Sequence, residues 1–155
     1  QTTVDWAGLY GNASGEFVLG AGGDEFYTWR ADASKVFAAN GSVNWGEVQT
    51  ATAGAVDEYF GLEGADDTAG TFESTIDATV AGTELSGLNA TKTFNSTGGE
   101  VWTTALLSDS NTPIFMGEAI DTGAVSFNGE AADYQMLVAT GEDKLVSYNM
   151  YIDLE

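Results

Sequence analysis

The stretch 131–154 reads AADYQMLVATGEDKLVSYNMYIDL and carries the clearest structural pattern in the chain. Residues 134–139 are rich in strand formers, and the turn cluster 140–143 separates them from the second run, 144–154. In that second run apolar side chains recur at every other position, namely at Val146, Tyr148, Met150, Ile152 and Leu154. This period of two predicts a β-hairpin with one buried face.

Similar patterns extend along the chain. Alternating runs at 71–80 and 100–107 predict two further strands, and residues 56–60 are the best candidate for a short helix. Asn40-Gly41 is a hairpin signal that predicts a strand over 42–48. Shorter strand candidates lie at 16–20, 25–30, 114–121 and 124–127.

The strand candidates number roughly ten and recur about every ten residues, with glycine or asparagine between them. This spacing is typical of antiparallel architectures and differs from alternating strands and helices. The sequence therefore predicts one all-β domain over 1–155, an antiparallel β-sandwich or barrel of jelly-roll or Ig-like type.

Charge restricts the possible partners. The chain has 24 Asp and Glu against four Lys and Arg, a net charge of -20. Nucleic acid is excluded as a partner because phosphate binding needs clustered cations. Anionic lipid surfaces would repel the chain for the same reason, and no apolar run approaches the 18 or so residues that insertion into a membrane requires.

Several features predict export. The chain begins with Gln1 rather than Met, as expected after removal of a signal peptide. Glycosylation sequons begin at Asn12, Asn40, Asn89 and Asn95, each in turn-like surroundings. We therefore expect a secreted glycoprotein that is extracellular or on the cell surface. Cysteine is absent, so redox chemistry does not discriminate between compartments.

The composition argues against an enzyme. Without His and Cys, the chain lacks the groups for Ser-His-Asp catalysis, Cys-His catalysis and most zinc sites. A glycosidase with two carboxylates stays open, but 24 acidic residues make some close pair inevitable by chance. The sequence therefore predicts no catalytic residue and no enzymatic activity.

Two patterns suggest ligand binding. Glu63, Asp66 and Asp67 offer oxygen ligands for calcium, the one cofactor candidate, but they lack EF-hand spacing and the sequence favours an acidic surface turn. The four tryptophans could form a sugar-binding platform. Tryptophans within strand patterns are more often part of the core, and we expect this of Trp45 and Trp102. These patterns support an alternative function, a secreted carbohydrate- or calcium-binding β-sandwich module.

The start at Gln1, the sequons, the lack of cysteine, the scarcity of lysine and the near-continuous short strands together resemble secreted archaeal cell-surface proteins. The chain is most similar to β-rich subunits of extracellular filaments and sheaths, including bundling-pilus and thread proteins. That resemblance implies a structural subunit whose partner is itself, forming a homopolymer. It also implies that a terminal strand of one subunit completes the sheet of the next by β-strand addition.

The N-terminal segment 1–6 is the candidate for that donor strand. Val4 and Trp6 lie on one face of an extended QTTVDW segment, so a neighbour's groove would bury both side chains. A frayed tail is the alternative interpretation. Because the net charge is strongly negative, copies in contact would repel one another. Salt screens this repulsion, and the screening becomes stronger as the salt concentration rises.

Overall fold

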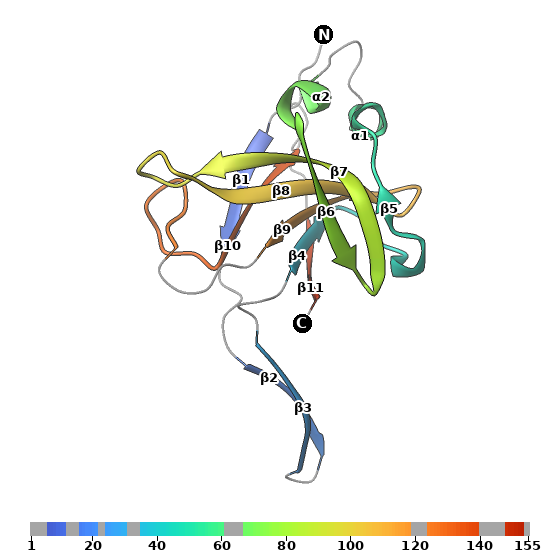
Figure 1. The fold of residues 1–155 in the computed structure, drawn as a ribbon, viewed down its shortest axis with the longest axis vertical. Helices are drawn as coiled ribbons and strands as arrows, with labels where there is room; N and C mark the ends of the chain where they lie inside the picture. The colour runs from blue at the N-terminus through green and yellow to red at the C-terminus, as the bar shows by residue number, and fades with distance from the viewer. Residues whose placement is uncertain are drawn as a thin grey trace.

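The computed structural model describes residues 6–11, 16–21, 24–30, 35–60, 67–118, 124–139 and 148–153. Two layers of antiparallel strands and two short helices form a body, and a separate two-stranded hairpin extends from it (Figure 1). The predicted all-β sandwich is confirmed, and its larger sheet does not close into a barrel. None of the described helices has the length and apolarity needed to cross a membrane.

The strands and helices follow one another in short elements. In chain order they are β1 (Trp6–Gly11), β2 (Glu16–Ala21), β3 (Asp24–Arg30), β4 (Lys35–Ala39), η2 (Trp45–Glu47), β5 (Gln49–Thr50), α1 (Ala53–Tyr59), α2 (Asp67–Thr71), β6 (Ser74–Val80), β7 (Thr83–Phe94), β8 (Glu100–Ser108), β9 (Pro113–Glu118), β10 (Tyr134–Ala139) and β11 (Asn149–Asp153).

The larger sheet has the order β11-β4-β9-β8-β7-β6, and β5 pairs with β8 beside this path. A ribbon of β1 and β10 forms the second layer and packs against β8 and β9. The ribbon is fastened to the larger sheet by a side-chain bond, because the backbone N–H of Leu137 donates to the Thr104 hydroxyl at 2.9 Å. Strand alternation therefore gives the larger sheet two apolar faces, each with its own cover.

One face packs against the β1–β10 ribbon and the helices. Phe115 and Leu106 of the larger sheet, both fully buried, meet Met136 of β10 and Val56 of α1 there. The two helices are themselves joined, since the backbone N–H of Thr68 donates to the Asp57 carboxylate at 3.2 Å. This cluster is the main core between the layers.

The opposite face is covered by the β6–β7 hairpin, which folds back over it (Figure 1). Phe37 and Met116 of the sheet pack there against Leu88 of β7. The hairpin bends at a register shift between Ile76 and Ala78, and Gly87 adopts a positive φ of 68°. The Asp77 carboxylate holds this bend by accepting the Gly87 N–H at 2.9 Å.

The predicted hairpin over 134–154 is wrong in its pairing. The strands exist, but β10 pairs with β1 and β11 pairs with β4, in different layers. The physical reason is that β10 buries Met136 in the main core, whereas Tyr151 of β11 packs on the opposite face of the larger sheet. Met150 and Ile152, which we expected to be buried, are each 39% exposed.

Of the other predicted strands and helices, some are confirmed and one is wrong. The strand expected over 71–80 is confirmed from Ser74 to Val80 as β6, whereas Thr71 ends α2. The short helix expected at 56–60 overlaps α1, which begins three residues earlier and ends at Tyr59. The strand expected over 42–48 is wrong, because this segment holds the 3-10 helix η2. The Asn44 side chain caps η2 by accepting the Gly46 N–H at 3.1 Å, which favours a turn over an extended strand.

Candidate assembly surface

The predicted calcium ligands fall almost wholly outside the described residues. Glu63 and Asp66 lie outside them, and Asp67 is described only by its backbone, as the first residue of α2. Within the described parts of the chain, no three acidic side chains gather into a metal site. The calcium site stays a prediction.

Three of the four predicted glycosylation sites are described, and their amides have different surroundings. The Asn40 side-chain oxygen accepts the Tyr59 hydroxyl at 2.7 Å, and that of Asn95 accepts the Thr97 N–H at 3.0 Å. The Nδ2 of Asn89, by contrast, donates to the Ala51 carbonyl at 3.1 Å in a half-buried part of β7. Asn12 lies outside the described residues.

The predicted donor segment ends inside its own chain's fold. Trp6 pairs with Ala139 in register, and its ring lies 5.2 Å from that of Phe72 and 6.2 Å from that of Phe115. Among the described residues, its buried indole N–H has no hydrogen-bond partner. Val4 lies outside the described residues. A donor role for 1–6 therefore stays a prediction, and it would require Trp6 to leave these contacts.

The edge strand β11 exposes apolar side chains at one end of the larger sheet. One side of β11 pairs with β4, and no other described strand pairs with its second side. Met150 and Ile152 are each 39% exposed on it, and Asp153 is its only charged residue. Edge strands in native proteins are normally blunted by charges, bulges or proline, and β11 has little of this protection.

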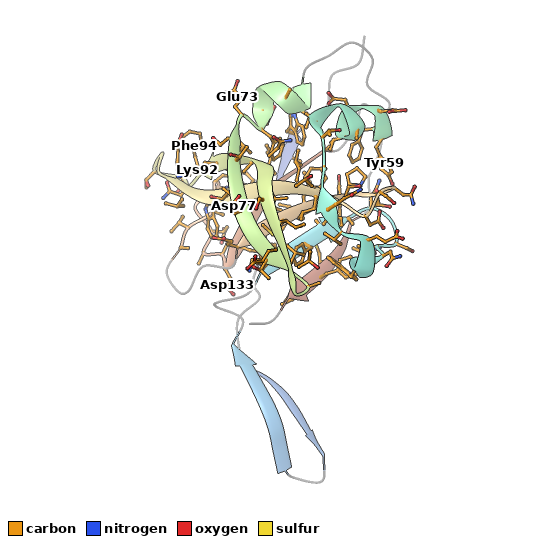
Figure 2. All side chains as sticks on the ribbon, turned by 45° about the vertical axis from the view of Figure 1, so that its right-hand side comes forward. Tyr59, Glu73, Asp77, Lys92, Phe94 and Asp133 are labelled. Atoms are coloured by element: carbon orange, nitrogen blue, oxygen red, sulfur yellow. The ribbon has the colours of Figure 1, made fainter. Side chains whose placement is uncertain are left out.

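The other edge strand of the larger sheet, β6, is protected. Its outward face is polar, and Figure 2 labels Asp77 on β6 and Glu73 just before the strand begins. The register shift beside Asp77 also interrupts regular pairing. The two edges of one sheet therefore differ in kind, since β11 exposes apolar side chains and β6 exposes polar ones.

A pocket of about 280 Å³ opens beside β11, between that strand and the β6–β7 turn. Phe37, Trp45, Val80, Ala81, Tyr151 and Ile152 line it. The ring of Trp45 lies 5.1 Å from that of Phe37 and 5.3 Å from that of Tyr151, both in edge-to-face contact. These contacts fix an aromatic wall beside the open edge.

The pocket wall is held by a buried carboxylate. Asp109 accepts the Asn44 N–H at 2.9 Å and the Thr112 N–H at 2.7 Å, which anchors the segment leading into Trp45. Burial alone would raise the pKa of Asp109, but the N–H groups of Asn44, Thr112 and Asn111 outweigh it and lower that pKa. The carboxylate therefore stays ionised and keeps this segment in place.

The start of β11 is anchored by Tyr148. Its hydroxyl donates to the Ala139 carbonyl at the end of β10, and its ring packs on Phe115, 6.0 Å away. Burial, with the nearby Tyr59 adding to it, raises the pKa of Tyr148 well above its usual range. A neutral hydroxyl thus joins the two layers just before the exposed edge begins.

The pocket is better suited to side chains than to a small ligand. Its volume lies at the lower limit of the roughly 300–1,000 Å³ of typical ligand sites. Its lining residues are all uncharged, and only the Trp45 N–H and the Tyr151 hydroxyl offer polar side-chain atoms. Together with β11 it forms the candidate assembly surface, which consists of β11 and the six pocket residues.

Sequence reasoning missed this surface for identifiable reasons. Trp45 was expected in the core and is instead half-buried at the pocket, whereas Trp102 is buried to 1% exposure as expected. The run Met150-Tyr151-Ile152, apolar on both faces of one short strand, was the available signal of an unusual edge. Comparisons with protein-family models, with curated proteins and with solved structures find no match to this chain.

Proposed function

We propose that this chain is a structural subunit that assembles with copies of itself into an extracellular filament, sheath or surface layer. Strand addition at β11 joins the copies, and the chain is secreted, in keeping with its likeness to archaeal surface proteins. The observation that carries this proposal is the apolar edge of β11, with which no further described strand pairs, in a sheet whose other edge is protected.

Adding a strand at β11 satisfies two physical needs together. It pairs backbone N–H and C=O groups that otherwise bond to water, which gives register and direction. It also covers Met150 and Ile152, each still 39% exposed. Because complete burial of such a side chain is worth about 1.5–3 kcal/mol, covering the exposed part contributes about 1 kcal/mol for each.

Charge sets the conditions for assembly. Copies with a net charge of -20 repel one another, and the repulsion is screened over about 8 Å at physiological salt and about 3 Å at 1 M. Raising the salt concentration, adding divalent cations or lowering the pH mildly should therefore strengthen assembly. At β11 and its pocket, where Asp153 is the one charged residue, two such copies would meet with little repulsion.

The alternative, a carbohydrate- or calcium-binding module, has weaker support. A sugar site needs several convergent polar groups, whereas the aromatic pocket offers two polar side-chain atoms among its lining residues. An isolated monomer under all conditions would favour this alternative.

The test compares two variants with the same change in charge. Met150→Lys places a cation on the exposed edge β11, and Thr75→Lys places one on the exposed face of the other edge strand, β6. Negative-stain microscopy and sedimentation, at about 0.1 and about 2 M salt, should show fibres or layers for the wild type and for Thr75→Lys, and monomers for Met150→Lys. A wild type that stays monomeric in salt, divalent cations and mild acid overturns the proposal.

A further inference from the structure

The chain contains two Asn-Gly steps, and the structure holds them differently. Asn40 and Gly41 form a bend directly after β4, whereas Asn128 and Gly129 belong to the turn within the 124–131 segment. An Asn-Gly step can react with itself, because glycine has no Cβ to keep its backbone N–H away from the preceding side-chain amide. In a folded chain the reaction depends on how that amide and that N–H are held.

The amide of Asn128 is held at both ends. Its Oδ1 accepts the Ser126 hydroxyl at 2.6 Å and the Glu130 N–H at 3.2 Å, and its Nδ2 donates to the Tyr10 hydroxyl at 2.7 Å. The neighbouring N–H is also engaged, since Gly129 donates to the Ser126 carbonyl at 3.2 Å. Neither group can turn toward the other without breaking these bonds.

The described contacts hold Asn40 at its oxygen alone. Tyr59, which ends α1 and is labelled in Figure 2, donates its hydroxyl hydrogen to the Asn40 Oδ1 at 2.7 Å. The same hydroxyl lies 3.8 Å from where a Cβ on Gly41 would stand. Among the described residues, none forms a hydrogen bond with the Asn40 Nδ2 or with the Gly41 N–H. These contacts therefore polarise the amide carbonyl and leave both nitrogens of the step unengaged.

We propose that Asn40 is a site of spontaneous deamidation and that Tyr59 promotes the reaction. The Gly41 backbone nitrogen attacks Cγ of Asn40, the new C–N bond closes a succinimide ring, and the Cγ–Nδ2 bond breaks. Ammonia leaves with the proton that the Gly41 nitrogen gives up. Water then adds to either carbonyl of the ring and opens it, which leaves aspartate or isoaspartate at this position. In sum, an amide and a water become a carboxylic acid and an ammonia.

Tyr59 stabilises the charge that develops in the first step. As the Gly41 nitrogen attacks, negative charge builds on the Asn40 Oδ1, which already accepts the Tyr59 hydroxyl. Donors placed in this way form the oxyanion holes of enzymes, where removing one slows the reaction about 10²–10³-fold. The effect is smaller here because water screens a side chain that is 41% exposed. We expect loss of the hydroxyl to slow deamidation about 3- to 10-fold, the value of one ordinary hydrogen bond.

The reaction changes a segment that supports the candidate assembly surface. Position 40 directly follows β4, the strand that pairs with β11, and the segment after it leads to Trp45 of the pocket. Aspartate adds a negative charge there, and isoaspartate also inserts a methylene group into the backbone. Asn40 begins a glycosylation sequon as well, so a glycan on its Nδ2 would hinder ring closure. Glycosylation and deamidation therefore compete for the same nitrogen.

Peptide mapping by mass spectrometry tests the proposal. The folded chain, made in a host that does not glycosylate it, is incubated at mildly alkaline pH, which favours loss of the Gly41 proton. We expect the peptide with Asn40 to gain the mass of deamidation and to split into aspartate and isoaspartate forms on chromatography. The peptide with Asn128 should stay intact. In concentrated urea, which releases both steps from their contacts, the two should react at similar rates.

The matched variant is Tyr59→Phe, which removes the hydroxyl and keeps the ring that packs against Phe60. It should slow deamidation of Asn40 in the folded chain and leave the rate in urea unchanged. The site is refuted if Asn40 survives in the folded chain as long as Asn128 does. The role of Tyr59 is refuted if Tyr59→Phe reacts as fast as the wild type or faster. Because the reaction needs no contact between copies, neither result depends on whether the chain polymerises.

Discussion

Replacing Gln135 with leucine tests how far one buried amide stabilises this sandwich. Gln135 is 2% exposed on β10, and its side chain joins three separate segments. Its Oε1 accepts the Phe127 N–H at 2.8 Å. Its Nε2 donates to the Thr93 hydroxyl at 2.8 Å and to the Phe94 carbonyl at 3.1 Å. The amide therefore holds the ribbon, the end of β7 and the 124–131 segment together.

The expected loss follows from what leucine leaves behind. Leucine is similar in size, so packing changes little, but the N–H of Phe127 and the carbonyl of Phe94 lose their partner. Leaving a buried donor or acceptor unpaired costs about 1–3 kcal/mol. Because both groups are only partly buried, we expect a total of about 2–4 kcal/mol, a large share of the about 5–15 kcal/mol that stabilises most domains.

Urea unfolding followed by tryptophan fluorescence measures this loss. Trp102 is a suitable reporter because its indole N–H donates to the Val125 carbonyl at 3.0 Å, within the segment that Gln135 holds. The matched control is Thr93→Val, which removes one of the three bonds and should cost about 1 kcal/mol. The reasoning is refuted if Gln135→Leu loses less than about 1 kcal/mol, or no more than Thr93→Val.

Two further predictions concern Asp109 and the sequons. The folded pKa of Asp109 is lowered, so its stabilising contribution is present above the unfolded pKa of about 3.9 and is lost as pH falls through the folded pKa. Urea unfolding should therefore show Asp109→Asn less stable than wild type at pH 7, with the difference narrowing below about pH 4. After secretion from a glycosylating host, mass spectrometry should find glycans at Asn40 or Asn95 but not at Asn89, whose Nδ2 already bonds to Ala51. An occupied Asn89 would contradict this.

Strands could be predicted where alternation reflects a difference between core and solvent. In β6 the buried Val80 and the half-buried Ile76 alternate with the exposed Asp77 and Thr79, so period and burial agree. In β8, by contrast, Thr104 to Leu107 are all buried because the strand lies inside the sheet with both faces covered, so its alternation does not mark a solvent face. Local pattern records packing where one face of a strand meets the core and the other meets solvent.

Partners and edges could not be predicted by the same reasoning. Neighbouring strands in sequence favour a local hairpin, yet β10 and β11 join different layers because their apolar residues are covered by different elements. Alternation also marked Met150 and Ile152 as buried, although they lie on an edge. The surface at β11 could not be predicted because an exposed apolar edge strand and a covered apolar strand have the same alternating sequence pattern.

The unlike edges of the larger sheet have a consequence for how copies would be ordered. In the proposed assembly β11 receives a strand and β6 does not, so the two edges of each copy have different roles. A donor strand from elsewhere in the chain would make such contacts heterologous, and copies joined in this way would stack in one direction or close into a ring. A fibre of such copies would have polarity, with an unfilled β11 edge at one tip only. Growth and capping at the two tips are then chemically different events.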